Sequence, residues 1–262
     1  MSAPGELGSY DPAFVARHAP WIEGLLRRWF RARIHGLDAV PDAPALFVGN
    51  HSGAAMIPDT LVWVGAYHTA GRRTPMLTLA HDQMFEAYPA LVASFLARMG
   101  GLRAGRARAL EALASGHALT VYPGGDYDAC RPFSRRHTIE LAGRTGYVEL
   151  ARDAGVPIVP VVSVGAHEAL VVLWDGRWLA RRLPFARARR LTVFPLTLSV
   201  PWGLFLGPLP GYVPLPTKIE LRVLDAIDPT DGRVDEVDRR VRASLQEALD
   251  AMAKARRFPW IG

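Results

Sequence analysis

The chain has 262 residues, half of them hydrophobic and 21% charged, and its formal net charge is +6. This composition excludes a largely disordered protein and supplies enough apolar side chains for one sizeable α/β core. A single cysteine, Cys130, excludes a disulfide framework or a cysteine-based zinc site within one chain and fits a reducing cytoplasm.

The positive charge is almost entirely arginine, since the chain contains only two lysines. An excess of arginine permits anionic partners such as phosphates, coenzyme A or an acidic membrane surface. Codon bias in a GC-rich genome explains the excess more simply. The charge therefore allows these partners without selecting one of them.

The first predicted element is a helix over residues 11–34, where large apolar side chains recur at helical spacing among arginines that include Arg17, Arg27, Arg28 and Arg31. Aromatic and arginine side chains together are typical of a helix at a membrane interface. A helix packed on its own domain has the same pattern. No basic and then apolar segment precedes it, so no secretory signal is expected. We expect an interfacial helix at 1–34 and an α/β domain at 35–262.

Three short apolar runs, at residues 45–51, 119–125 and 156–164, end in polar or glycine-containing segments. Buried parallel strands deliver their C-terminal ends to a site in this way. Helical patterns occur at 87–98, 106–115 and 144–154, followed by an alternating strand at 218–227 and an amphipathic helix around 237–252. We therefore expect a single α/β domain with a mostly parallel central sheet flanked by helices, and ligands outside the carboxyl ends of the strands.

Residues 191–217 carry no charged side chain and are long enough to span a bilayer. Prolines interrupt this stretch, and each removes a backbone donor, which is costly in lipid. We expect a packed or interfacial segment and no transmembrane helix. The prolines are Pro195, Pro201, Pro208, Pro210, Pro214 and Pro216.

His51 is the first candidate for chemistry, because it directly follows the first apolar run and precedes a stretch of small residues that leads to Asp59. A carboxylate partner holds a histidine in its neutral tautomer, ready to accept a proton near pH 7. Without further signals, a structural histidine is an equally good interpretation. Ser52 suggests a serine hydrolase, but the chain has no Gly-x-Ser-x-Gly elbow.

A second cluster follows the run at 119–125, where Gly124 and Gly125 let backbone amides approach an anion or a developing oxyanion. Arginines follow at 131, 135 and 136. The alternative is an ordinary Pro-Gly-Gly turn beside a solvated charged face. Cys130 is a competing nucleophile, but a lone cysteine is far more often a small buried hydrophobic residue.

Together these clusters resemble the lysophospholipid acyltransferase family, also called the glycerophosphate acyltransferase-like family. The resemblance covers residues 34–229. Asn50 and His51 match its first motif, residues 100–104 (GGLRA) its glycine-rich second block, and residues 122–125 and 156–160 its third and fourth blocks. In the second block Arg103 stands at a position that faces the acceptor in the family.

Two departures from the family pattern matter. The family usually places four residues between its histidine and aspartate, whereas seven separate His51 from Asp59, and Met56 stands at the usual aspartate position. Small residues and Pro58 favour a looped-out insertion that returns Asp59 to the histidine; the alternative is loss of the orienting carboxylate. Gly124 replaces the usual glutamate of the third block. The block in this form resembles the branch of the family that includes diacylglycerol acyltransferase-type enzymes. The resemblance therefore does not establish whether the acceptor lipid carries a phosphate.

The resemblance implies direct transfer of an acyl group from acyl-CoA, or acyl carrier protein, to a hydroxyl of a glycerolipid or lysophospholipid on the cytoplasmic side of a membrane. His51 is then the general base and Asp59 its orienting carboxylate. Acyl-CoA is a co-substrate, and no cofactor, metal or nucleic acid is expected. A non-catalytic lipid-binding protein of the same fold is the alternative, and the oligomeric state stays open. The expected substrate-binding residues are Asn50, Ser52, Gly53, Arg103, Gly124, Gly125, Asp126, Arg131 and Arg144.

Overall fold

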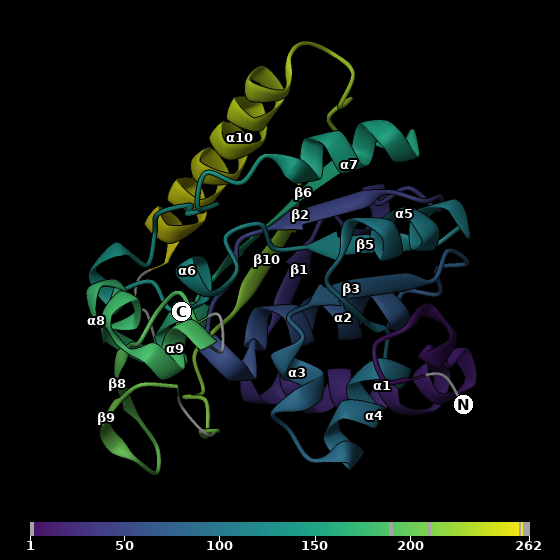
Figure 1. Ribbon diagram of the computed structural model, residues 1–262. Helices are drawn as coiled ribbons and strands as arrows, with labels where there is room; N and C mark the ends of the chain where they lie inside the picture. The colour runs from purple at the N-terminus through teal and green to yellow at the C-terminus, as the bar shows by residue number, and fades with distance from the viewer. Residues whose placement is uncertain (1–2, 189–190, 209–210, 257, 259–262) are drawn as a thin grey trace.

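A seven-stranded sheet forms the centre of the computed structural model, which describes residues 3–188, 191–208, 211–256 and 258 (Figure 1). Its strands are β1 (Arg33–His35), β2 (Leu46–Gly49), β3 (Met76–Ala80), β4 (Gly101–Arg103), β5 (Ala118–Val121), β6 (Ile158–Val164) and β10 (Glu220–Val223). Their order is β1-β10-β6-β2-β5-β3-β4. The five strands from β6 to β4 are parallel, and β10 runs antiparallel to β6. The predicted mostly parallel α/β fold is confirmed.

Helices cover both faces of this sheet (Figure 1). One face carries α5 (Arg106–Ala114), α7 (Gly146–Ala154) and the C-terminal α10 (Val234–Ala255), and the other carries α1 (Pro12–Trp29) and α2 (Pro58–Thr69). Two short helices, α3 (Gln83–Glu86) and α4 (Ala90–Arg98), lie between β3 and β4 in the chain. No helix in the described ranges is long and apolar enough to cross a membrane.

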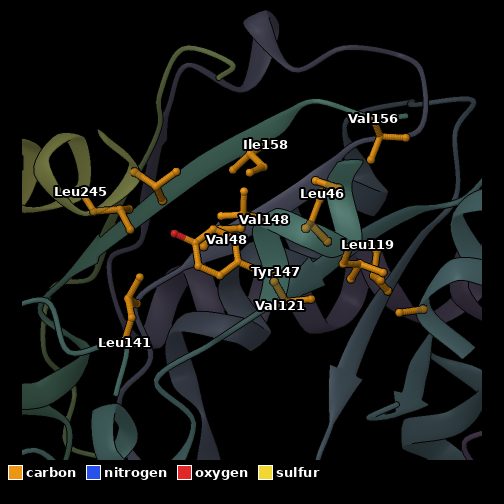
Figure 2. Packing of buried hydrophobic residues seen from close by; sticks show 14 of the residues in the cluster. Leu46, Val48, Leu119, Val121, Leu141, Tyr147, Val148, Val156, Ile158 and Leu245 are labelled. Carbon is orange, nitrogen blue, oxygen red and sulfur yellow. The ribbon is translucent and has the colours of Figure 1, made fainter. Parts of the chain in front are cut away.

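Alternating side chains of the central strands build two hydrophobic clusters. In β2, Leu46 and Val48 pack under α5, α7 and α10, whereas Phe47 faces α2 and contacts Trp63. Figure 2 shows the first cluster, in which Leu245 lies among the strand side chains. Burial on both faces explains why β2 reads as an unbroken apolar run in the sequence.

The N-terminal helix is shorter than the predicted span of 11–34. Asp11 caps α1 by accepting the Phe14 N–H at 2.9 Å, and the helix ends at Trp29. Arg31 then adopts a positive φ of 45°, and the chain pairs with β10 as β1. The helical spacing continues through residue 30 in sequence, but pairing with a strand almost 190 residues away overrides it. The predicted boundary between residues 34 and 35 falls inside β1.

Residues 191–217 contribute to a second, antiparallel sheet of β7 (Val171–Trp174), β8 (Leu196–Ser199) and β9 (Gly203–Leu206), with Pro210 outside the described residues. Helices α8 (Arg177–Arg182) and α9 (Pro184–Ala188) lie between β7 and β8. The inner face of this small sheet packs on the loop that follows β2, where Met56 joins the cluster around Tyr212. The Tyr212 hydroxyl donates to the Gly53 carbonyl at 2.6 Å. This sheet was not predicted, because Pro195 and Pro201 flank β8 and hide its strand alternation.

Candidate active site

Three neighbouring strands end at one edge of the central sheet. His51 follows β2, Tyr122 follows β5, and His167 follows β6. Since these strands are parallel and adjacent, in the order β6-β2-β5, their C-terminal ends converge there. The candidate site is this edge.

The His51 imidazole lies beside the carboxylate of Asp59. The distance from Nδ1 of His51 to Oδ1 of Asp59 is 3.4 Å, and the hydroxyl of Thr60 lies 3.3 Å from the same nitrogen. The histidine side chain is 13% exposed and the aspartate 1%. The imidazole ring stacks on Tyr122, with ring centroids 4.4 Å apart. This arrangement directs Nδ1 toward the buried carboxylate, whereas Nε2 has no hydrogen-bond partner among the described residues.

The seven residues between His51 and Asp59 fold back on themselves. Gly53 has a φ of 80°, and a Cβ at this position would lie 2.3 Å from Cδ of Pro58. Ile57 adopts left-handed angles of 39° and 54°, an uncommon conformation for a β-branched residue that costs about 1–3 kcal/mol. Pro58 then begins α2, which places Asp59 in its first turn. The enlarged loop therefore returns a carboxylate to the histidine.

Ser52 and Thr60 hold the Asp59 carboxylate. The hydroxyl of Ser52 donates to Oδ2 at 2.8 Å, and the backbone N–H of Thr60 donates to Oδ1 at 2.7 Å. Ser52 is 1% exposed, so its hydroxyl is committed to the aspartate and is not presented to a substrate. Its position therefore supports an orienting role for Ser52 and gives no support to a serine nucleophile.

The backbone of His51 is held by a buried polar cluster that we call the Asp128 cluster, made of Asp128, Arg131 and His167. Asp128, which follows the Pro-Gly-Gly turn on α6 (Asp126–Ala129), accepts the backbone N–H of His51 and pairs with the Arg131 guanidinium. Arg131 in turn donates to Nε2 of His167 at 2.6 Å. The side chains of Asp128 and Arg131 are both completely buried.

Burial and the neighbouring charge of Arg131 hold the pKa of His167 well below its usual value, so this imidazole is neutral. Since Nε2 accepts from Arg131, the proton resides on Nδ1, and the ring also hydrogen bonds the backbone of His51. Burial lowers the pKa of Arg131 to about 9, which still leaves it charged at pH 7. The cluster thus fixes the histidine from its main chain.

Asn50 also anchors this strand end. Its side-chain amide donates to the carbonyl of Ser163 at 2.9 Å and accepts the N–H of the same residue at 2.7 Å. Asn50 is 2% exposed. It therefore mimics a backbone rung that extends the pairing of β2 with β6, and it holds His51 without facing a substrate.

The Pro-Gly-Gly turn leaves no room for a side chain at its first glycine. A Cβ on Gly124 would lie 2.0 Å from the carbonyl oxygen of Glu140 and 2.5 Å from Cβ of Asp128. A glutamate at this position, as the family usually has, does not fit. The N–H of Gly125 donates to the carbonyl of Tyr122 at 3.0 Å, so it is not a free donor for an anion.

Asp126 and Arg144 flank this turn. The Asp126 carboxylate accepts both the N–H and the hydroxyl of Thr192 and thereby ties the turn to the segment before β8. Arg144 is exposed, lies against Gly125, and donates to the carbonyl of Pro123 at 2.8 Å. Within the described residues it has no carboxylate at ion-pair distance. Arg144 is thus the expected anion-binding arginine whose charge is still available.

Two other arginines expected to bind substrate are engaged elsewhere. Arg131 is buried in the Asp128 cluster, because the carboxylate and His167 already use its guanidinium. Arg103 lies on β4, three strand spacings or about 14 Å from β2. It pairs with Asp82 at 3.3 Å and Glu86 at 2.9 Å. The structure brings neither guanidinium to His51 as an unpaired cation.

Cys130 is buried beside the site and does not qualify as a nucleophile. Burial raises the pKa of its thiol to about 12, and the nearby carboxylates of Asp126 and Asp175 add to the effect. The thiolate is the reactive form, so this cysteine is inert at neutral pH. Among the described residues, no group of three or more histidine, cysteine or acidic side chains has the arrangement of a metal site.

Sequence reasoning missed Asp128 and His167. Both lie just beyond the C-terminal ends of predicted strands, which is the signal that identified His51. Asp128 and Arg131 are three residues apart in a polar segment, and such a pair resembles a solvated helical face unless its burial is known. Applying the strand-end rule to the third run would have singled out His167.

Comparison with known proteins places this arrangement in a family. A family model described as Acyltransferase matches residues 31–164, slightly more than half of the chain. An uncharacterized protein of Mycobacterium tuberculosis (strain H37Rv) is 28% identical over 264 residues, which cover 97% of this chain and 70% of that protein. The mouse (Mus musculus) DGAT1/2-independent enzyme synthesizing storage lipids is 26% identical over 233 residues, which cover 87% and 68%.

A solved structure shares the fold. The crystal structure of the 1-acyl-sn-glycerophosphate (LPA) acyltransferase PlsC from Thermotoga maritima aligns with a TM-score of 0.60 at 16% identity, over 94% of this chain and 82% of that one. This likeness agrees with the parallel sheet and its flanking helices. From the family match, the chain belongs to the acyltransferase family.

Proposed function

We propose that this acyltransferase moves a fatty acyl group from acyl-CoA to a hydroxyl of a glycerolipid at a membrane surface. The observation that carries the proposal is the partly exposed His51 imidazole, whose Nδ1 lies 3.4 Å from the buried Asp59 carboxylate. An alcohol is a poor nucleophile at pH 7, so a base must remove its proton during attack. His51 is positioned to be that base.

The proposed step is direct transfer. Nε2 of His51 removes the hydroxyl proton as the alkoxide oxygen attacks the thioester carbonyl, and a carbon–oxygen bond forms. The tetrahedral intermediate collapses, the carbon–sulfur bond breaks, and the proton on Nε2 passes to the departing thiolate. Asp59 stabilises the imidazolium while it exists. The buried, protonated thiol of Cys130 supports a mechanism without an acyl-enzyme.

Two groups at the Pro-Gly-Gly turn complete the proposed site. The N–H of Gly124 has no hydrogen-bond acceptor among the described residues, so it is our candidate donor to the oxyanion. Arg144, exposed beside the turn, is our candidate contact for a phosphate of coenzyme A or of the acceptor lipid. Both assignments keep the anions at the same strand edge as His51.

Two comparisons support a glycerolipid acceptor. The mouse relative is named for the synthesis of storage lipids, and the protein that shares the fold is named as an acyltransferase of 1-acyl-sn-glycerophosphate. The aromatic and arginine side chains of α1, together with the uncharged segment 191–217, support action at a membrane surface. We place this action on the cytoplasmic side.

Release of free coenzyme A tests this proposal. Purified protein is given a labelled acyl-CoA with and without a lipid extract, and the lipid product is identified by mass analysis. The proposal predicts thioester cleavage only when a lipid hydroxyl is present, and loss of that cleavage in His51→Ala. Lipid binding without cleavage, unchanged in that variant, would instead favour a non-catalytic lipid-binding protein.

A further inference from the structure

The small sheet of β7, β8 and β9 has one buried face and one exposed, apolar face. Its inner face is covered, because Val172 and Thr197 are buried at 1% and 0% exposure. Pairing aligns the outer side chains into two rungs. One rung consists of Val171, Leu198 and Leu204, and the other of Trp174, Leu196 and Leu206.

We call these six side chains the outer face. Leu198 is 50% exposed, Leu204 64% and Leu206 48%. The β8–β9 turn continues the apolar surface with Val200 and Trp202, each 49% exposed. Isolated exposed apolar side chains are ordinary, but a contiguous set of this kind marks an interaction surface.

The outer face is connected to the candidate active site. A groove of about 410 Å³ lies at the end of this face next to the β8–β9 turn and is lined in part by Ala169, Val171, Leu198 and Val213. Ala169 lies two residues after His167 of the Asp128 cluster. The inner face of the same sheet packs with Met56 and Ala54, in the loop between His51 and Asp59. A ligand on the outer face is therefore separated only by this small sheet from the loop that joins His51 to Asp59.

The charges beside this face select its partner. Residues 191–217 contain no acidic or basic side chain, whereas α8, which follows β7, presents Arg181 and Arg182 to solvent. Neither arginine has a carboxylate at ion-pair distance in the described part of the chain. Arg182 lies 5.1 Å from the ring centroid of Trp178, which is 60% exposed. Apolar side chains bordered by tryptophan and unpaired arginine fit the interface of an anionic bilayer.

A second copy of the chain fits this surface less well. If two copies docked through the same face, the unpaired arginines of both α8 helices would lie at the rim of the contact. No acidic residue of the 191–217 segment is available to compensate them. Anionic headgroups compensate these charges without any rearrangement.

We propose that the outer face and the β8–β9 turn are the surface that inserts into an anionic membrane, with the α8 arginines at its headgroups. This inference rests on the membrane part of the proposed function, and it names the element responsible. It requires no catalysis, so it is tested by binding alone.

The experiment labels this face with a polarity-sensitive dye. Because Cys130 is the single cysteine and is buried, Leu204→Cys provides one accessible thiol for an NBD fluorophore. Vesicles contain equal parts phosphatidylcholine and phosphatidylglycerol at low salt. The inference predicts a blue-shifted, brighter emission on vesicle addition. Ala114→Cys, exposed on α5, which lies on the opposite side of the molecule from β8 and β9 (Figure 1), is the control and shows no shift.

Matched charge variants test the energetics. Leu198→Glu with Leu204→Glu lowers vesicle affinity about tenfold or more, because the variant loses the free energy gained when two leucine side chains move from water into the bilayer. The control adds the same two negative charges at the C-terminal end of α5, in Ala114→Glu with Ser115→Glu, and lowers the affinity far less. If the glutamates unfold the protein, serines at 198 and 204 replace them, with the thermal midpoint as the check.

The inference would be overturned if the protein did not bind vesicles, or if it sedimented with them while the NBD group at residue 204 stayed in water. It would also be overturned if the glutamates at 198 and 204 lowered vesicle affinity no more than the control glutamates do. A dimer that forms through this face and that vesicles do not disperse would contradict it as well. His51→Ala protein binds vesicles as the wild type does. Failure of the proposed chemistry is thereby distinguished from failure of the docking surface.

Discussion

The carboxylate of Asp128 accepts a hydrogen bond from the backbone N–H of His51, although 77 residues separate them in the chain. The same carboxylate pairs with Arg131, and both side chains are completely buried. The candidate base is therefore fixed twice: through its ring by Asp59, and through its main chain by a charged pair that has no contact with solvent. Each of these two contacts makes its own prediction.

Replacing Asp128 by asparagine removes the partner of a buried arginine. We expect the free energy of unfolding to fall by about 3–5 kcal/mol, because the charge of Arg131 stays buried after its carboxylate partner is removed. Combining Asp128→Asn with Arg131→Met removes that charge and restores part of the loss. Urea unfolding measures both. Asp126→Asn is the control, because the carboxylate of Asp126 accepts from the amide and hydroxyl of Thr192 and has no cation at ion-pair distance among the described residues; it costs about 1 kcal/mol.

Replacing Asp59 by asparagine tests the contact between the carboxylate and the His51 ring. The imidazole then loses the charge that stabilises its protonated form, and kcat/KM for acyl transfer falls by about 10² to 10⁴. Ser52→Ala, which removes one donor to that carboxylate, has a smaller effect of about tenfold. Steady-state kinetics on folded protein decide the matter. An Asp59→Asn enzyme with the activity of the wild type would remove Asp59 from the mechanism.

Cys130→Ala leaves turnover within about threefold of the wild type, because the cysteine acts only as a small buried apolar residue. Single-turnover kinetics provide the sharper readout, since direct transfer accumulates no acyl-enzyme. Detection by mass spectrometry of an acyl group on Cys130 during turnover, or abolished activity in the folded variant, would contradict the account.

Stability should fall as the pH is lowered from 6.5 to 4. Burial lowers the pKa of His68 from 6.5 to about 4, so between these values the unfolded chain binds a proton that the folded chain does not. Acidification therefore favours unfolding by about 1.4 kcal/mol per pH unit for this group. Above pH 6.5 its contribution is constant. His68→Gln reduces the slope of unfolding free energy against pH by that amount, and an unchanged slope would show that His68 does not titrate in this way.

The sequence predicted the structure correctly where one local pattern determined it. The apolar runs at 45–51, 119–125 and 156–164 became β2, β5 and β6, because strands buried on both faces have no polar alternation. Their shared carboxyl edge brought His51 next to the Pro-Gly-Gly turn. The small residues and Pro58 after His51 were compatible with a loop that returns Asp59.

Prediction from the sequence failed where pairing between distant segments, or the burial of a side chain, determined the structure. Residues 33 and 34 lie inside the predicted helix of 11–34 but belong to β1, which pairs with β10. Arg131 resembles a phosphate ligand until its burial beside Asp128 is seen. The β7–β9 sheet was not predicted, because Pro195 and Pro201 flank β8 and because the outer face of the sheet is apolar. Local propensity contains none of this information, since all three features depend on contacts between remote segments.

The central claim is that His51 removes the proton of a lipid hydroxyl. The most direct measurement compares wild-type and His51→Ala protein for coenzyme A released from acyl-CoA in the presence of a glycerolipid acceptor, with circular dichroism to confirm folding. The account predicts that the wild type releases coenzyme A in step with acylated lipid and that the variant is slower by about 10² to 10⁴. A folded His51→Ala protein that acylates the lipid at the wild-type rate would contradict it.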